Sequence, residues 1–167
     1  EKKEGKREMY LADYHMHSKY SFDGSEELDT ICQTAIRRGL SEIAITDHMD
    51  IYTGLPYDEQ MNFDVPGGEQ HHMDAVGLYK ELCNMKEKYA GQLKVRIGAE
   101  LGQPQVNPEA AELFMKDYGD VLDFVIGSIH NMEKDLDVYY YDFTKIDVVK
   151  MYDHYVDWLL KLSEMGD

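Results

Sequence analysis

The segment SEIAITDH, residues 41–48, combines a short apolar stretch with two ionisable residues at its end. Its length and its apolar centre are typical of a buried β-strand. Residues 25–38, just before it, carry apolar side chains at the spacing of one helix face, and Gly39 is placed to end that helix. A helix that leads directly into a buried strand predicts one unit of an α/β fold.

The same alternation of strand and helix recurs along the chain. Four segments predict strands: residues 9–17, 41–48, 93–101 and 122–130. Helices are predicted after each of them, with Ser25 as the N-cap of the first and Asn107 capping a helix that begins at Pro108. The last helix is predicted from about Thr144. This order predicts parallel (β/α) repeats in a single α/β domain.

Composition and charge limit the function. The 167 residues fit one domain with a sizeable core. A net charge of −16 disfavours nucleic acid as a partner, and no apolar run is long enough to span a membrane. Cys32 and Cys83 lie in helix-like segments, so we expect free, buried thiols and a cytoplasmic location. The charged residues 1–8 are expected to form a disordered lead-in.

Ionisable residues stand at the end of every predicted strand. They are His15 and His17, then Asp47 and His48, then Glu100, and finally His130. The carboxyl ends of parallel strands share one rim of the sheet, so these side chains are expected to converge there. Crowded imidazoles and carboxylates need compensation, and a divalent metal would supply it. The sequence therefore predicts a metal site at this rim.

The first predicted strand specifies its two faces. With side chains alternating, Asp13, His15 and His17 would point one way, while Tyr14 and Met16 would point beneath the helices. A single histidine at a strand end is more often a simple hydrogen-bonding residue than a ligand. Only the presence of ionisable residues at the ends of all four predicted strands favours a metal site.

Other histidines and serines allow different interpretations. His71 and His72 are predicted at the start of the second helix, and these two and His154 are expected to be structural or surface residues. A serine nucleophile is conceivable, because some serines lie near histidines in the sequence: Ser18, Ser21 and Ser128. A Ser–His triad would leave the other strand-end residues unexplained.

Four motifs in order resemble the polymerase and histidinol phosphatase (PHP) superfamily. They are D-x-H-x-H in DYHMH, T-D-H in ITDHMD, G-x-E-L-G in IGAELG and G-S-x-H in IGSIHNM. The stretch DYHMHSKYSFDGS and the Tyr-rich tail favour the histidinol-phosphatase branch. The resemblance covers the chain from Met9 onwards and implies the N-terminal part of a distorted TIM-like (β/α)7 barrel.

The resemblance also implies an activity. Members hold up to three divalent metals (Zn, Mn or Fe) at the barrel mouth, and a hydroxide activated by these metals attacks a phosphate monoester. The implied reaction is hydrolysis of L-histidinol phosphate to histidinol and phosphate, a step in histidine biosynthesis. No side chain is implied as a catalytic group of its own.

The resemblance assigns metal ligands residue by residue. His15 and His17 match ligands of one metal, and Glu100 would bridge to a second metal that His130 also binds. The third metal would take Asp23 and His48. Asp47 matches a position that would orient an imidazole without binding metal.

The resemblance extends to about four strand–helix units in residues 9–167, and the C-terminal part of the family's barrel has no counterpart here. We therefore expect impaired activity, and either a fragment of a longer protein or a half-barrel that self-associates through its open edges. Two alternatives stay open: a PHP phosphoesterase acting on another phosphate ester, nuclease-like enzymes included, and a degenerate module that binds metal or a partner without catalysis.

Overall fold

The computed structural model describes residues 9–64, 70–132 and 136–165, with the backbone alone for residues 62–64 and 70–72. Its main feature is a parallel sheet centred on β6 (Lys94–Gly102). On one edge of β6, β2 (Glu42–Ile45) pairs with its first half and β3 (His48–Asp50) with its end. β1 (Ala12–Asp13) continues the sheet beyond β2, and β7 (Phe124–Ser128) pairs with the other edge of β6. The predicted α/β fold with parallel strands is confirmed.

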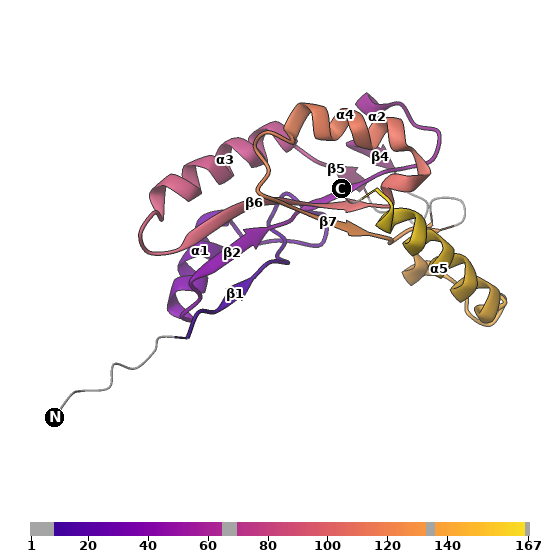
Figure 1. Ribbon diagram of the computed structural model, residues 1–167, viewed down its shortest axis with the longest axis horizontal. Coiled ribbons are helices and arrows are strands. Elements are labelled where there is room, and N and C mark those ends of the chain that lie inside the picture. Colours follow the sequence, from indigo (N-terminus) through magenta and orange to yellow (C-terminus); the bar gives the residue numbers. More distant parts are fainter. Residues whose placement is uncertain (1–8, 65–69, 133–135, 166–167) are drawn as a thin grey trace.

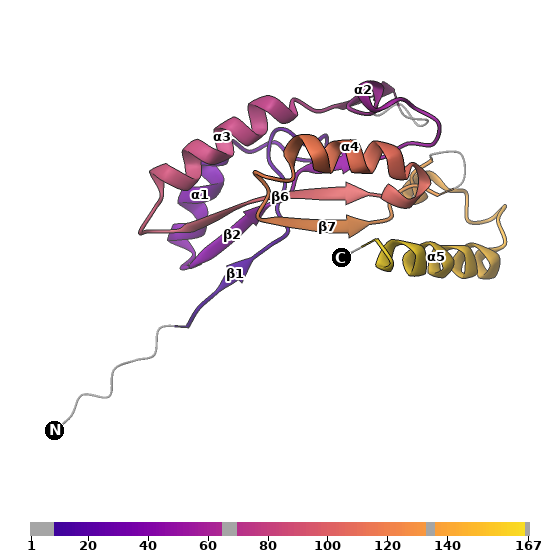
Figure 2. The ribbon, with the colours of Figure 1, turned by 45° about the horizontal axis from the view of Figure 1, so that its top comes forward.

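Helices follow the strands in the predicted order. Three of them, α1, α3 and α4, lie along one face of the sheet, whereas α5 lies beside β7 (Figures 1 and 2). The short α2 precedes a small antiparallel sheet of β4 (Asn62–Asp64) and β5 (Gln70–His72), which the sequence pattern did not predict. The helices are α1 (Leu28–Arg37), α2 (Tyr57–Gln60), α3 (Ala75–Lys88), α4 (Pro108–Tyr118) and α5 (Val148–Ser163).

The core lies between the sheet and the three helices on its face. Alternate residues of the central strands, such as Ile45 of β2 and Ile97 of β6, pack against Leu28, Leu82 and Phe114 from the helices, and all are buried. The residues between them in the strands point to the opposite face. This alternation lets one strand contribute both to the apolar core and to a polar surface.

The predicted first strand, residues 9–17, is too long. Only Ala12–Asp13 pair with β2, and the chain then leaves the ladder before the Met16 carbonyl accepts a hydrogen bond from Thr46 N (2.9 Å). Strict alternation therefore fails beyond Asp13, because it requires an extended strand. Tyr14 does not lie beneath the helices: its hydroxyl donates to Glu42 and its ring packs edge-on against Phe124, on the face opposite the helices.

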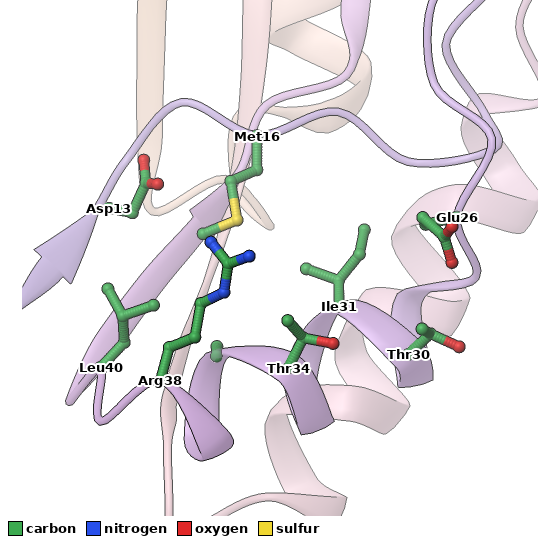
Figure 3. Close-up of a pocket in the computed structure, with 9 residues that line it drawn as sticks. Asp13, Met16, Glu26, Thr30, Ile31, Thr34, Arg38 and Leu40 are labelled. Atoms are coloured by element: carbon green, nitrogen blue, oxygen red, sulfur yellow. The ribbon is translucent and has the colours of Figure 1, made fainter.

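Met16, by contrast, lies beneath α1 as predicted. It lines a pocket between the β1 segment and α1, together with Asp13, Ile31 of α1 and Arg38 directly after α1 (Figure 3). The prediction that Asp13 shares a face with His15 and His17 is thus wrong. Asp13 is the last residue in the ladder, and the backbone turns away directly after it.

Several predicted boundaries shift by a few residues. The predicted strand 41–48 is interrupted at Thr46 and Asp47, so that it contains β2 and only the first residue of β3. Ser25 is not the N-cap of α1, which begins at Leu28 with Glu27 in the cap position and no side-chain bond there. Asn107 does cap α4, since its side chain accepts from Ala110 N (3.3 Å). The positive φ of +78° at Gly39 fits its expected role after α1.

The edges of the sheet are open in the part of the chain that the structure describes, where β1 and β7 each pair on one side only. α5 exposes several apolar side chains, among them Val149 and Leu160. Self-association through these edges stays a prediction. The two cysteines are free thiols, as expected, but only Cys32 is buried, whereas Cys83 is partly exposed. None of the described helices has the length and apolarity that crossing a membrane requires.

Candidate metal centre

The six predicted ligands converge at the carboxyl ends of the strands. His15, His17 and Asp23 lie on the connection between β1 and α1, while His48 opens β3. The other two are Glu100 of β6 and His130, two residues beyond β7. Strand register places His48 directly beside Glu100, because these two residues pair. β7, which precedes His130, runs parallel to β6 along its other edge and so brings His130 to the same rim of the sheet.

Glu100 is the centre of this cluster. Its Oε2 lies 2.9 Å from Nε2 of His15 and 2.9 Å from Nε2 of His17, and its Oε1 lies 2.9 Å from Nε2 of His130. The carboxylate is buried, and burial alone would raise its pKa. The imidazoles of His130, His17 and His15 outweigh burial and hold the pKa of Glu100 well below its ordinary value. The carboxylate is therefore ionised and faces several ligand nitrogens at once.

Asp23 and His48 extend the cluster to its other side. Asp23 Oδ2 lies 2.8 Å from Nδ1 of His17 and 3.5 Å from Nε2 of His48. Burial lowers the pKa of His17, but the carboxylates of Glu100 and Asp23 raise it to about 9. His17 thus stands between two carboxylates, one on each ring nitrogen.

The donor set fits divalent cations. The buried nitrogens His17 Nε2 and His48 Nδ1 have no hydrogen-bond partner among the residues that the structure describes. The close approach of His17 Nε2 to Glu100 lies outside hydrogen-bond geometry. Buried polar atoms without partners are costly, and a cation would satisfy them. Imidazole and carboxylate are suitable ligands for Zn, Mn and Fe. Three overlapping groups have donor atoms within 4.8 Å of one another: His15, His17 and Glu100; His17, Asp23 and His48; and His48, Asp50 and His130.

Asp47 supports the cluster through the backbone. It is fully buried, and its carboxylate accepts hydrogen bonds from Ser18 N (2.6 Å) and Ser18 Oγ (2.7 Å). Burial raises the pKa of Asp47, although these hydrogen bonds oppose that change. Its described hydrogen bonds therefore anchor the residue after His17 and do not reach an imidazole.

Two of the three serines that lie near histidines in the sequence, Ser18 and Ser21, have structural partners for their hydroxyls, whereas the buried Ser128 Oγ has no hydrogen-bond partner among the described residues. Ser18 Oγ donates to Asp47, and Ser21 Oγ accepts from the backbone N–H of His48 (2.8 Å). These contacts position loops around the cluster and do not form a Ser–His pair. Neither hydroxyl is arranged as a nucleophile activated by a base.

Two neighbours of the cluster were not predicted from the sequence. Asp50 is buried, and its Oδ1 lies 2.9 Å from Nδ1 of His130 and 3.7 Å from Nδ1 of His48. The signal for it is its position two residues after His48 in a strand, which places both on one face. Phe22 stacks on the His48 ring, with centroids 4.7 Å apart and 21° between the planes. For Phe22, the signal available in the sequence was an aromatic residue directly before Asp23.

The remaining histidines lie away from these groups or outside the described side chains. His71 and His72 belong to β5, not to the start of a helix as predicted, and their side chains are outside the described residues. His154 is in α5, where its ring packs edge-on against Trp158 at 5.1 Å. That contact agrees with a structural role for His154.

A family model and curated relatives match the chain. The PHP domain matches residues 13–167. A histidinol-phosphatase of Lactococcus lactis subsp. lactis (strain IL1403) is 28% identical over 131 residues, which are 78% of this chain and 43% of the relative. A histidinol-phosphatase of Bacillus subtilis (strain 168) is 26% identical over 128 residues, 76% of this chain and 46% of the relative. The chain thus spans less than half the length of these curated relatives.

A solved structure shows the same fold. The crystal structure of histidinol phosphate phosphatase from Lactococcus lactis, complexed with zinc, L-histidinol and phosphate, superposes with a TM-score of 0.60 and 27% identity. The match covers 77% of this chain and 43% of that one.

Fold and site together define a parallel α/β chain with a His and carboxylate cluster at the carboxyl ends of its strands. With the family matching most of its length, the chain belongs to the PHP domain family.

Proposed function

We propose that this chain serves as a metal-dependent phosphatase, a phosphoric monoester hydrolase whose substrate is L-histidinol phosphate and whose place is in histidine biosynthesis. The observation that carries the proposal is the contact of Glu100 with three imidazoles at one rim of the sheet. The Lactococcus lactis structure, which contains zinc, L-histidinol and phosphate, supports this substrate.

We assign the metal-binding role to His15, His17, Asp23, His48, Glu100 and His130, with up to three divalent cations of Zn, Mn or Fe. Bound cations would polarise the phosphoryl oxygens of the ester and lower the pKa of a coordinated water. The protein's part is to hold the donors in place: Glu100 is fixed by the sheet, and Asp47 anchors the loop that carries His17. The predicted location is cytoplasmic.

Activity is expected to be low in the 167-residue chain. The His15 side chain is 54% exposed, so this side of the cluster is open to water. Of the described arginines, Arg96 pairs with Glu42 (2.6 Å) and Arg38 lines the pocket next to Asp13. A phosphate ester would therefore depend on the cations for most of its charge compensation.

The test is phosphate release after metal reconstitution. The chain would be stripped with a chelator, reloaded with Zn, Mn or Fe, and assayed with L-histidinol phosphate, a generic aryl phosphate and a short oligonucleotide. We expect metal-dependent hydrolysis of L-histidinol phosphate above that of the other two. A preference for another ester would support a different PHP phosphoesterase, and bound metal without any hydrolysis would support a non-catalytic metal-binding module.

A further inference from the structure

The two ring nitrogens of His130 face two different carboxylates. Its Nε2 lies 2.9 Å from Glu100 Oε1, and its Nδ1 lies 2.9 Å from Asp50 Oδ1. Glu100 also contacts the other imidazoles of the cluster, so Nε2 points to the side where the candidate ligands gather. Nδ1 points to the opposite side, toward a carboxylate that is only 3% exposed.

The sheet leaves space for this contact at Gly102. Asp50 of β3 and Ser128 of β7 are the register partners of Gly102 on the two edges of β6. A Cβ atom on Gly102 would lie 1.9 Å from Asp50 Oδ1 and 3.2 Å from His130 Nδ1. Gly102 is not among the glycines with positive φ, so it is space and not backbone conformation that requires a glycine here. The Asp50 carboxylate therefore reaches His130 across the backbone of β6.

The backbone of His130 is fixed by Gln103, the residue directly after β6. Gln103 is buried, and its Oε1 accepts hydrogen bonds from the backbone N–H groups of His130 (2.8 Å) and Asn131 (3.2 Å). Gln103 itself has φ 40° and ψ 51°, a left-handed conformation that is uncommon for residues other than glycine. Gln103 thus fixes the main chain of His130, while Asp50 and Glu100 contact its ring.

We propose that Asp50 is a positioning residue that accepts the Nδ1–H of His130 and thereby keeps Nε2 deprotonated and directed at the metal centre. This inference rests on the proposed metal-dependent function. Histidine ligands commonly donate their second ring N–H to a carboxylate, which fixes both tautomer and ring orientation. Asp50 acts through His130 and not as a ligand, because its oxygen faces the nitrogen that points away from Glu100.

Zinc titration and histidine NMR test this proposal on the intact chain. Calorimetric titration with Zn²⁺ would give affinity and stoichiometry, and ¹⁵N-histidine spectra of the zinc-loaded protein would identify the protonated ring nitrogen of His130. For Asp50→Ala we expect zinc affinity to fall about 10–100-fold, with the number of bound zinc ions unchanged and the Nδ1–H signal of His130 altered. Asp50→Asn, which keeps an oxygen acceptor, should stay within a few-fold of the wild type.

Two further variants show whether the effect on zinc binding is due to the Asp50–His130 contact. Gly102→Ala should weaken zinc binding in the same direction, because its methyl group would occupy the path between Asp50 and His130. Asp153→Ala removes an exposed carboxylate from α5 and should change nothing. Circular dichroism would show whether each variant is folded. If Asp50→Ala does not fold, Gly102→Ala takes its place in the test.

The outcomes separate this inference from the proposed function. Zinc affinity and His130 tautomer unchanged in Asp50→Ala would overturn the positioning role alone. Loss of one zinc ion in both Asp50→Ala and Asp50→Asn would also overturn it, because Asp50 would then be a ligand. A wild-type chain that binds no zinc would overturn the metal-dependent function and this inference together.

Discussion

His48 and Glu100 are register partners on β3 and β6, and His48 Nδ1 lies 3.6 Å from Glu100 Oε2. Parallel pairing of two strands thus sets an imidazole beside a carboxylate without help from any loop. The rest of the cluster is arranged around this pair. The distance between these two side chains is therefore fixed by the sheet, and substitutions of either residue test the centre most directly.

Glu100→Gln should abolish most metal binding. The neutral amide keeps the shape of the side chain but removes the charge that contacts three imidazoles. We expect zinc affinity to fall by at least about a hundredfold, more than for loss of an orienting partner, as measured by equilibrium dialysis with metal analysis. Glu112→Gln, the same change at an exposed position of α4, is the matched control. Retention of wild-type zinc affinity in Glu100→Gln would contradict the assignment of Glu100 as a shared ligand.

Phe22→Ala should loosen His48. The Phe22 ring stacks on His48 and is 43% exposed, so its removal should cost only about 1 kcal/mol of folding stability. Zinc affinity should fall a few-fold, because the His48 ring loses the surface that restrains it. Phe143→Ala removes a comparably exposed ring outside the cluster and serves as control. Equal zinc affinity in the two variants would show that the stacking has no role in metal binding.

Acid stability should depend on Glu42. Hydrogen bonds from Tyr10 and Tyr14 lower the pKa of Glu42 from 4.5 to about 2, against the effect of burial, and Arg96 contributes in the same direction. Because the folded-state pKa is the lower one, this group stabilises the fold above pH 4.5, and the contribution is lost as the pH falls toward 2. Glu42→Gln should therefore reduce stability at neutral pH and show a shallower loss between these values.

Urea unfolding of the wild type and Glu42→Gln at several pH values would measure this difference. Glu42 lies away from the candidate ligands, so the comparison needs no metal. The difference in the free energy of unfolding between the two proteins should shrink as the pH falls. A difference that stays constant from pH 6 to pH 2 would contradict the role given to the Tyr10–Tyr14–Glu42 contacts.

Phe114→Ala should destabilise the fold strongly. Phe114 of α4 is fully buried in the core between sheet and helices. Removing such a ring typically costs about 3–5 kcal/mol, because the cavity is only partly refilled. The free energy of unfolding from urea titrations would measure the loss, with Met115→Ala on the exposed side of the same helix as control. A loss below about 1 kcal/mol would contradict the described core.

The open sheet edges predict self-association. Sedimentation velocity should detect dimers or larger species, and added salt should favour them by screening the net charge of −16. Leu160→Glu places a charge on the exposed apolar side of α5 and should shift the distribution toward monomer. A monomer at all protein and salt concentrations would refute self-association.

Most of the candidate site could be predicted from the sequence, because its residues stand at strand ends and parallel strands share a rim. The order of strands and helices was confirmed for the same reason, since apolar periodicity depends on local sequence. Details set by tertiary pairing could not be predicted. The interruption of the predicted strand 41–48 at Thr46 and Asp47 and the departure of the chain after Asp13 depend on where β6 offers partners.

Asp50 illustrates the limit most clearly. In the sequence it is one acidic residue among 33. Its position two residues after His48 places it near the cluster, but does not identify His130, 80 positions away, as its partner. The contact exists because Gly102 leaves room across β6, and a clearance of this kind is a property of three strands together. A glycine in the IGAELG motif gives no sign of which side chains will cross it.

The alternation along β6 links the cluster to folding accuracy. Glu100 faces the imidazoles, while its neighbours Ala99 and Leu101 are buried with the core. A slip of β6 by one residue would place an apolar side chain among the histidines and a carboxylate in the core. A cation would consequently bind only to molecules in which β6 has the correct register. Its binding would therefore stabilise correctly folded molecules over those with a shifted strand.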